Sequence, residues 1–378
     1  MAYVAVTGGR EAIAQANLLV DWARWRGGGP RLDIAGIEGQ LGALVHRVMA
    51  EGGMYAPSYA ALAIKQAQGD TLEAGFLIRA YRSTLPRHHT STVIEGTSMR
   101  VVRRISSAFK DIPGGQMLGA TGDYAHRLLD FGLRDEPANG AVRLAAALAV
   151  RAGERREGDD PAAWPTYPKV ADLLRAEGLV ATPPDGPDEK PYDVTREKLT
   201  FPVPRSGQLQ ILARGETGAM MALAYSSLRG FGAVHPTIGE LRVGYVELCV
   251  VHPLRPAEGP VYAGEILVTE VESINSFART DGDDRDRAAG PRFELGYGLC
   301  FGHNETKAIS MSILERAMGA GGQAPAADQE FVLSHVDSVE ANGFVSHLKL
   351  PHYVTFQSAL ARIRRARGLH AAGKGVDE

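Results

Sequence analysis

The segments LRVGYVELCVV (residues 241–251) and YAGEILVTEVESI (residues 262–274) decide the fold of this chain. Polar and apolar residues alternate along both segments, as they do in strands that direct successive side chains to opposite faces of a sheet. Residues 293–301 have a similar composition and form a third expected strand. We therefore predict antiparallel strands within residues 240–302.

The N-terminal third of the chain has a different pattern. Apolar residues recur there at helical spacing, and Gly and Pro separate the periodic runs. Asp33 is expected to cap one of these helices. The predicted helices cover residues 11–26, 33–49, 58–68, 70–84 and 124–133, and later 170–177, 206–228 and 304–318. A short strand is expected at residues 3–7. The predicted class is α+β, with a helix-rich N-terminal region and a mixed or antiparallel sheet in the C-terminal half.

Composition divides the chain into four regions. Residues 1–133 form the helical region, and residues 134–200, rich in Pro, Gly and charge, form an exposed connector with one short helix. Residues 201–325 form an α/β core with antiparallel strands. Residues 326–378 hold a histidine-containing site segment and a C-terminal helix.

Composition also excludes several classes of function. The chain has 378 residues and a net charge of −3 at pH 7, so it lacks the basic footprint of a nucleic-acid-binding protein. It has no apolar run long enough to cross a membrane and no apparent signal peptide, so we expect a cytoplasmic protein. Cys249 and Cys300 lie in apolar runs and are expected to be buried thiols, and two cysteines cannot bind a four-thiolate iron–sulfur cluster.

The segment FVLSHVDSVEANGFVSHLKLPHYVTF (residues 331–356) has the composition of a site. Pro351 disfavours a continuous helix between His347 and His352, so we expect a turn or extended loop there. Leu348 and Leu350 alternate with polar neighbours as in a short half-buried strand. In such a loop both imidazoles can face one point. The segment and its flank also carry His335, Glu330, Asp337, Glu340 and Lys349.

His347 and His352 have two interpretations. Two neutral imidazoles suit zinc or a similar divalent metal, but zinc takes four ligands, so a third would come from His335, a carboxylate or another chain. The alternative is a histidine pair without metal. The spacing alone is a weak signal and favours this alternative.

A basic segment at residues 99–116 also has two interpretations. It contains Arg100, Arg103, Arg104 and Lys110 and ends in a Pro-Gly-Gly turn. It is either a solvated basic helix face or a phosphate-binding segment, because arginine forks and the amides of a Gly turn both suit phosphate oxygens.

Five segments resemble the PhnI family, a subunit of the bacterial carbon–phosphorus lyase core complex. They are RVMAEGG (47–53), RISSAFKDIPGGQ (104–116), GDYAHRLLDF (122–131), ALAYSSLRGFG (222–232) and EFVLSHVDSVEANGFVSHLKLPHYVTFQ (330–357). The resemblance covers most of the chain and is weakest in residues 134–200, in residues 279–291 and in the tail.

The resemblance implies an activity, partners and a metal site. Members displace adenine from ATP with methylphosphonate, giving α-D-ribose 1-methylphosphonate 5-triphosphate, and act alone as nucleosidases on ATP or GTP. Their partners are PhnG, PhnH, the radical-SAM subunit PhnJ and the ABC-type ATPase subunits PhnK and PhnL. The family's two metal-binding histidines match His347 and His352, at the interface with PhnJ.

Displacement of adenine creates positive charge on the sugar, beside a negatively charged triphosphate. Such a site needs carboxylates near the sugar and cations near the phosphates. We assign the first role to Asp337, Glu340 and Glu330, and the second to Arg103, Arg104, Lys110 and Lys349. The alternative is a scaffold subunit without catalysis, which supplies metal ligands and positions PhnJ.

Overall fold

The chain folds into two compact units. The computed structural model describes residues 9–137, 139–152, 166–180, 191–229, 235–277 and 291–373. The helical unit comprises Met1–Thr84, Arg214–Ala219 and Leu333–Glu378, and the sheet unit comprises Leu85–Ala213 and Met220–Val332. The α+β class predicted from sequence is confirmed. Within the described residues, no helix has both the length and the apolar character needed to cross a membrane.

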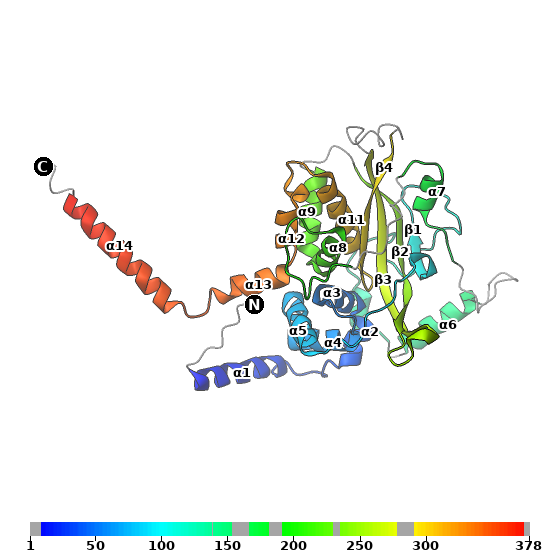
Figure 1. Cartoon of the computed structure of the whole chain (residues 1–378). Coiled ribbons are helices and arrows are strands. Elements are labelled where there is room, and N and C mark those ends of the chain that lie inside the picture. The colour runs from blue at the N-terminus through cyan, green and yellow to red at the C-terminus, as the bar shows by residue number, and fades with distance from the viewer. Residues whose placement is uncertain are drawn as a thin grey trace. The chain divides into compact units, whose positions relative to one another are not determined.

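The sheet unit is built on four antiparallel strands in the order β1-β2-β3-β4 (Figure 1). They are β1 (Arg100–Ile105), β2 (Thr237–Val251), β3 (Pro260–Phe277) and β4 (Phe293–Phe301). The three predicted strands are confirmed, with β2 and β3 longer than expected. The basic helix face considered for residues 99–116 is wrong. The segment RVVRRI is rich in β-branched residues and pairs with β2 as strand β1.

The two faces of this sheet differ in character. Arg104 lies opposite Arg242, which in turn lies opposite Glu270, so one face carries buried charges. Helix α7 (Val170–Ala176) covers this face, and its first amide donates to Glu240 at 3.1 Å. The other face is apolar and lies against helix α11 (Glu305–Ala320), which runs beside β3 and β4 in Figure 1.

Two glycines of β4 permit the close approach of α11. A Cβ atom at Gly296 would collide with the carbonyl oxygen of Ser312, and one at Gly298 with that of Ala308. Neither carbonyl can move freely, because both belong to the backbone of α11. The pattern GYG in β4 is therefore required by packing.

We expect Gly298→Ala to destabilise the protein by about 1–3 kcal/mol, because overpacked sites cost that much. Thermal denaturation followed by circular dichroism measures the change. Gly319→Ala is the control, since Gly319 lies in α11 with no atom within 4 Å of an added Cβ. That change should be neutral or stabilising by up to about 1 kcal/mol. Equal stabilities of the two variants would contradict this account of the packing.

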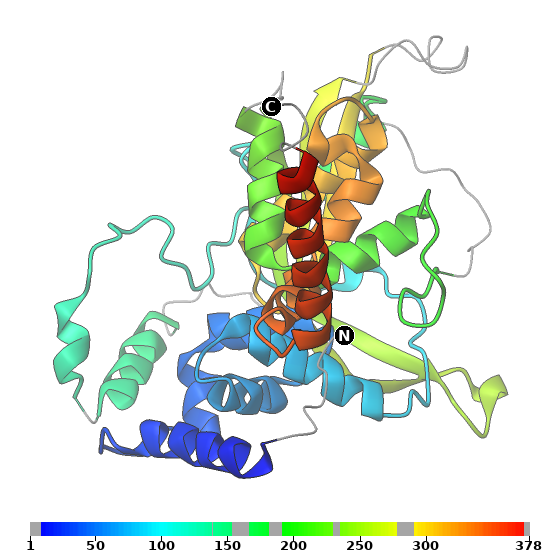
Figure 2. The same cartoon turned by 90° about the vertical axis from the view of Figure 1, so that its left-hand side faces the viewer.

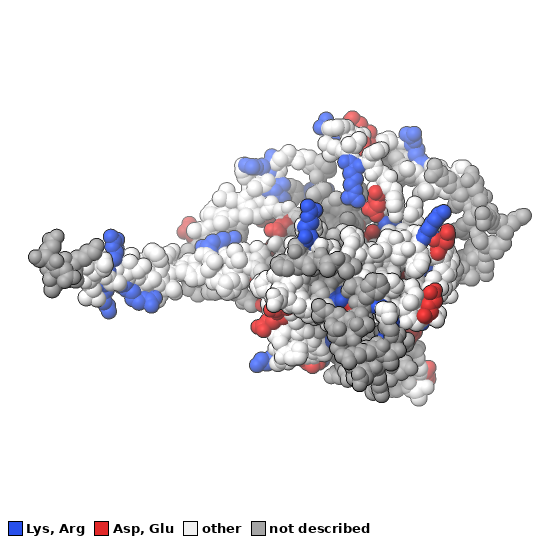
Figure 3. Space-filling view, turned by 90° about the horizontal axis from the view of Figure 1, so that it is seen from above, with Lys and Arg blue, Asp and Glu red and all other residues white. Residues whose placement is uncertain are grey.

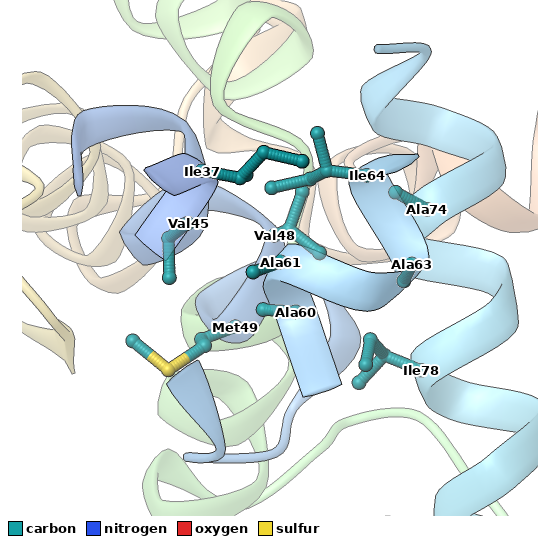
Figure 4. Close-up of a cluster of buried hydrophobic side chains, with 10 residues drawn as sticks. All are labelled: Ile37, Val45, Val48, Met49, Ala60, Ala61, Ala63, Ile64, Ala74 and Ile78. Atoms are coloured by element: carbon teal, nitrogen blue, oxygen red, sulfur yellow. The ribbon is translucent and has the colours of Figure 1, made fainter. Parts of the chain in front are cut away.

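The helical unit has a core formed by four short helices (Figures 1 and 2). They are α2 (Ile34–Gln40), α3 (Gly42–Gly52), α4 (Pro57–Gln66) and α5 (Thr71–Thr84). Their buried side chains meet in one apolar cluster (Figure 4). Val48, Met49, Ala60, Ala61 and Ala74 are among its fully buried members. Small residues in α4 allow the neighbouring helices to approach closely.

The remaining helices of this unit include two with almost no buried surface. Helix α1 (Arg10–Trp25) has no buried residue, and α14 (Tyr353–Gly373) has none among the residues whose burial is described. Between the core and α14 lies α13 (Ser338–His347), while α12 (Gln329–His335) begins in the sheet unit and ends in the helical unit.

Several predicted helices are confirmed, and two are interrupted. The Asp33 cap is confirmed, since its side chain accepts from the amide of Gly36. The helix expected at 33–49 breaks at Leu41, which has φ −113° and ψ 38°. The helix expected at 206–228 forms as α8 (Arg205–Arg214) and α9 (Thr217–Arg229). Glu216 causes this break, because its carboxylate caps α9 by accepting from the amides of Gly218 and Ala219.

The helix predicted at residues 124–133 is wrong. Only the short 3-10 helix η2 (Phe131–Asp135) forms there, and Tyr124, Leu128 and Leu129 are exposed. A short helix whose apolar face has no packing partner is marginal in water. The connector has its predicted helix α7 and a second one, α6 (Gly140–Ala152). The strand expected at 3–7 lies outside the described residues. The other short 3-10 helices are η1 (Gly96–Ser98), η3 (Pro256–Glu258) and η4 (Pro325–Ala327).

Candidate functional site

Residues 347–352, which we call the histidine turn, join α13 to α14. Helix α13 ends at His347, and Pro351 separates it from the start of α14 at Tyr353. The expected turn is thus present. The short strand expected at Leu348 and Leu350 is wrong, because Leu348 has helical dihedrals and the amide of Leu350 donates to the carbonyl of His347 at 2.9 Å.

The turn holds the two imidazoles together. The ring centroids of His347 and His352 are 5.1 Å apart, with 57° between the ring planes. Nδ1 of His352 lies 2.6 Å from the carbonyl oxygen of Leu350, and Nδ1 of His347 contacts that of Phe344. A carbonyl oxygen only accepts hydrogen bonds, so each neutral ring carries its proton on Nδ1. Both Nε2 atoms then have a lone pair for a metal, the arrangement usual in histidine ligands.

The pair supplies only two ligands. Across the described residues, no group of three or more His, Cys, Asp or Glu side chains is placed to hold a metal ion. Neither His335 nor a described carboxylate completes the set. A four-coordinate metal at this turn would need its other ligands from water or another chain.

A hollow of about 300 Å³ lies beside the turn, and we call it the His347 hollow. Its lining is mostly polar, with hydrogen-bond acceptors and one cation. The lining residues are Ala67, Asp70, Glu73, Asn342, Ser346, His347, Lys349 and Leu350. Asp70 and Glu73 were not predicted as site residues. Asp70 also caps α5 by accepting from the amides of Leu72 and Glu73. Because a capping role explains an Asp at this position, the sequence gives no separate signal for a site role.

The three predicted carboxylates are divided between the two units. Asp337 caps α13 by accepting from the amide of Glu340 at 3.2 Å, so these two residues lie together in the helical unit. Both Asp337 oxygens accept from Nη1 of Arg79, at 2.8 and 2.5 Å. Glu340 is exposed. Glu330 is exposed in α12 and belongs to the sheet unit.

The four predicted cations are likewise divided, with Arg103, Arg104 and Lys110 in the sheet unit and Lys349 in the helical unit. Arg103 and Arg104 lie in β1, where their guanidiniums are buried. Nε of Arg104 is 2.5 Å from Oε1 of Glu240, and Arg103 pairs with Asp123 and Glu305 at 2.7 and 2.6 Å. Because both guanidiniums are buried, each needs a negative charge close by, and carboxylates of the same unit supply it. Lys110 is exposed after β1, and Lys349 alone reaches the His347 hollow.

Three arginines that were not predicted gather near Asp337. We call Arg79, Arg82 and Arg214 the arginine group. Burial, together with the neighbouring charges of Arg79 and Arg82, lowers the pKa of Arg214 to about 10, although Asp337 and Glu340 act in the opposite direction. Arg79 and Arg82 are three residues apart, which places them on one side of a helix and is a signal in the sequence. Nothing in the sequence places Arg214 beside them.

The fold is that of an α+β protein, and its histidine turn offers two possible metal ligands, fewer than the three that a catalytic zinc takes from protein. Residues 2–370 match the family described as bacterial phosphonate metabolism protein PhnI. The chain belongs to the PhnI family.

Three relatives support this assignment over nearly their full lengths. HtxH of Stutzerimonas stutzeri, provisionally described as a C-P lyase subunit protein, is 51% identical over 96% of this chain and 95% of its own. The α-D-ribose 1-methylphosphonate 5-triphosphate synthase subunit PhnI of Escherichia coli K12 is 46% identical, over 96% and 98%. The subunit of the same name from Rhizobium meliloti 1021 is 44% identical, over 98% and 96%.

Proposed function

We propose that this chain is the subunit of a carbon–phosphorus lyase complex that makes α-D-ribose 1-methylphosphonate 5-triphosphate. The similarity to two subunits of that name, at 46% and 44% identity over nearly complete chains, carries this proposal. The chain would act in phosphonate metabolism, as the family description states. A cytoplasmic location stays a prediction.

The proposed reaction exchanges one bond at the sugar. An oxygen of methylphosphonate forms a bond to C1′ of ATP while the bond between C1′ and the adenine nitrogen breaks. The electron pair leaves with adenine, which gains a proton. Without phosphonate, water would take the same place, giving the nucleosidase activity on ATP or GTP. In both cases positive charge develops on the sugar, and a nearby carboxylate stabilises it.

The group around Asp337 suits this chemistry best. Asp337 and Glu340 bring negative charge to the start of α13, and the arginine group brings positive charge to the same region. We propose that these carboxylates face the sugar. Arg79 would keep Asp337 in place through its two hydrogen bonds and its bonds to the carbonyls of Glu51 and Arg214. Glu330 belongs to the sheet unit and is not included in this group.

We further propose that His347 and His352 bind zinc or a similar divalent metal, with PhnJ supplying a further ligand. Their protonated Nδ1 atoms and open Nε2 atoms fit this role. A metal bound there would act as a Lewis acid toward an oxygen ligand. Lys349 and the polar lining of the His347 hollow lie next to it and would hold a phosphate or a sugar hydroxyl.

One observation favours the scaffold alternative as an additional role. Helix α1 exposes Leu18, Leu19 and Trp22, and α14 exposes Val354 and Ile363. The sequence of α14 also contains four arginines and no carboxylate, and this helix carries blue side chains at the edge of Figure 3. Such surfaces suit contacts with other subunits, and PhnG, PhnH, PhnJ, PhnK and PhnL are the proposed partners.

The purified chain should release free adenine from ATP, and a scaffold without catalysis should release none. We expect Asp337→Asn to lower the rate of adenine release at least tenfold, because it removes a charge while keeping a side chain that caps a helix well. Chromatographic detection of adenine measures the rate. Asp33→Asn is the matched control, since Asp33 caps α2 in the same unit. An unchanged rate in Asp337→Asn, with a lower melting temperature, would assign Asp337 a purely structural role.

A further inference from the structure

The arginine group surrounds the end of helix α3. Arg79 donates to the carbonyl oxygen of Glu51 from Nε and Nη2, at 2.9 and 2.8 Å. Arg82 donates to that of Gly53 at 3.1 Å. The last carbonyls of a helix carry partial negative charge and repel anions. Here two guanidiniums already bind these carbonyls, so an anion close to this helix end would lie nearer to positive charge than to the carbonyl oxygens.

Arg214 differs from Arg79 and Arg82 in the hydrogen bonding of its guanidinium. Its Nε atom is buried and makes no hydrogen bond with any residue that the structure describes. Its lowered pKa has burial and two neighbouring guanidiniums as causes. A group in this situation is stabilised by an added negative charge, because that charge offsets both the lost hydration and the repulsion. Asp337 and Glu340 offset only part of it, and Asp337 is bound to Arg79.

Gly53 lies against both Arg82 and Arg214. It has φ +66°, the left-handed conformation that glycine adopts without strain. A Cβ atom there would lie 3.1 Å from Nη1 of Arg82 and 3.3 Å from Nε of Arg214. Both guanidiniums therefore border the same point above the end of α3. A tetrahedral oxyanion offers several acceptor oxygens that match such a pair of donors.

We propose that Arg82 and Arg214, next to Gly53, bind the phosphate chain of the nucleoside triphosphate. This inference rests on the proposed function and names the part of the substrate held at that site. Arg79 links the two roles, since it bonds both Asp337 and the backbone of Arg214. The carboxylates at the start of α13 would face the sugar, while Arg82 and Arg214 hold the phosphates.

Binding of inorganic tripolyphosphate to the full-length chain tests the inference without any turnover. We expect calorimetry at low salt to show binding that Arg214→Gln weakens about tenfold or more, because charged hydrogen bonds are lost. Arg364→Gln is the matched control, since Arg364 is exposed on α14 and its loss removes the same charge. Equal affinity of Arg214→Gln and wild type, or no binding by wild type, would overturn the proposal.

Two further variants and one competitor sharpen the test. Arg214→Lys keeps the charge without the Nε donor, so we expect intermediate affinity, and it serves if Arg214→Gln does not fold. Gly53→Ala keeps all charges but brings a Cβ atom within 3.1 Å of Nη1 of Arg82 and strains a left-handed residue, so it should weaken binding as well. Methylphosphonate should displace tripolyphosphate poorly, and equal competition would assign the site to the phosphonate and overturn the inference. Tripolyphosphate binding without adenine release would refute the proposed activity and leave this site standing.

Discussion

Loss of either imidazole from the histidine turn should remove most of the metal from the assembled complex. His347→Ala and His352→Ala would each reduce the two proposed ligands of this chain to one. A shared site that loses an imidazole then has too few ligands to hold zinc. We expect metal occupancy to fall at least tenfold and growth on methylphosphonate as sole phosphorus source to stop. Adenine release by the isolated chain should change little, since the carboxylates assigned to that step lie at the other end of α13. Metal analysis of purified complexes measures the occupancy.

His335→Ala is the matched control, because it removes an imidazole from the same segment without touching the pair. Pro351→Ala should reduce occupancy less than either pair variant. It loosens the turn but keeps both rings and the carbonyls of Phe344 and Leu350 that orient them. Full occupancy in the double variant His347→Ala/His352→Ala would refute the ligand assignment and leave a histidine pair without metal.

The main strands could be predicted because their signal is local. Residues 241–251 and 262–274 alternate over many positions, and the pattern depends only on which face each side chain occupies. Strand β1 was not predicted because its alternation includes arginines. Arg104 occupies an inward position that a sequence pattern assigns to apolar residues, and it is tolerated there because it pairs with Glu240 and donates to the carbonyls of Pro113 and Pro168. That partner is 136 residues away.

The candidate site also has one part that could be predicted from sequence and another that could not. His347 and His352 are five residues apart with Pro351 between them, so their approach is a local property and could be predicted. The arginine group is assembled from α5 and from the end of α8, and its charge balance depends on Asp337, far along the chain. No local pattern encodes such a meeting. Clustering in sequence instead points to Arg103, Arg104 and Lys110, together with Lys349, and the first two are close in sequence because they occupy neighbouring positions of β1.

Arg104→Met should lower the free energy of unfolding by about 3–5 kcal/mol, because it leaves Glu240 buried without its cation. The Arg104 side chain is 0% exposed and that of Glu240 2%. Adding Glu240→Gln should recover much of the loss, since the amide is uncharged and still accepts from the amide of Val170. Urea denaturation of the single and double variants measures both effects.

The same change separates a structural role of Arg104 from the phosphate-binding role predicted for it. If Arg104 bound phosphate, its replacement would raise the KM for ATP and leave stability nearly unchanged. If Arg104 is a buried partner of Glu240, its replacement should lower stability and leave the KM nearly unchanged. Arg205→Met is the matched control in the sheet unit, since Arg205 pairs with Glu315 but is 63% exposed. Exposed pairs contribute about 0–1 kcal/mol, so this variant should be almost as stable as wild type. A raised KM in a fully stable Arg104→Met would return Arg104 to the substrate site, because only contact with the phosphates could then explain it.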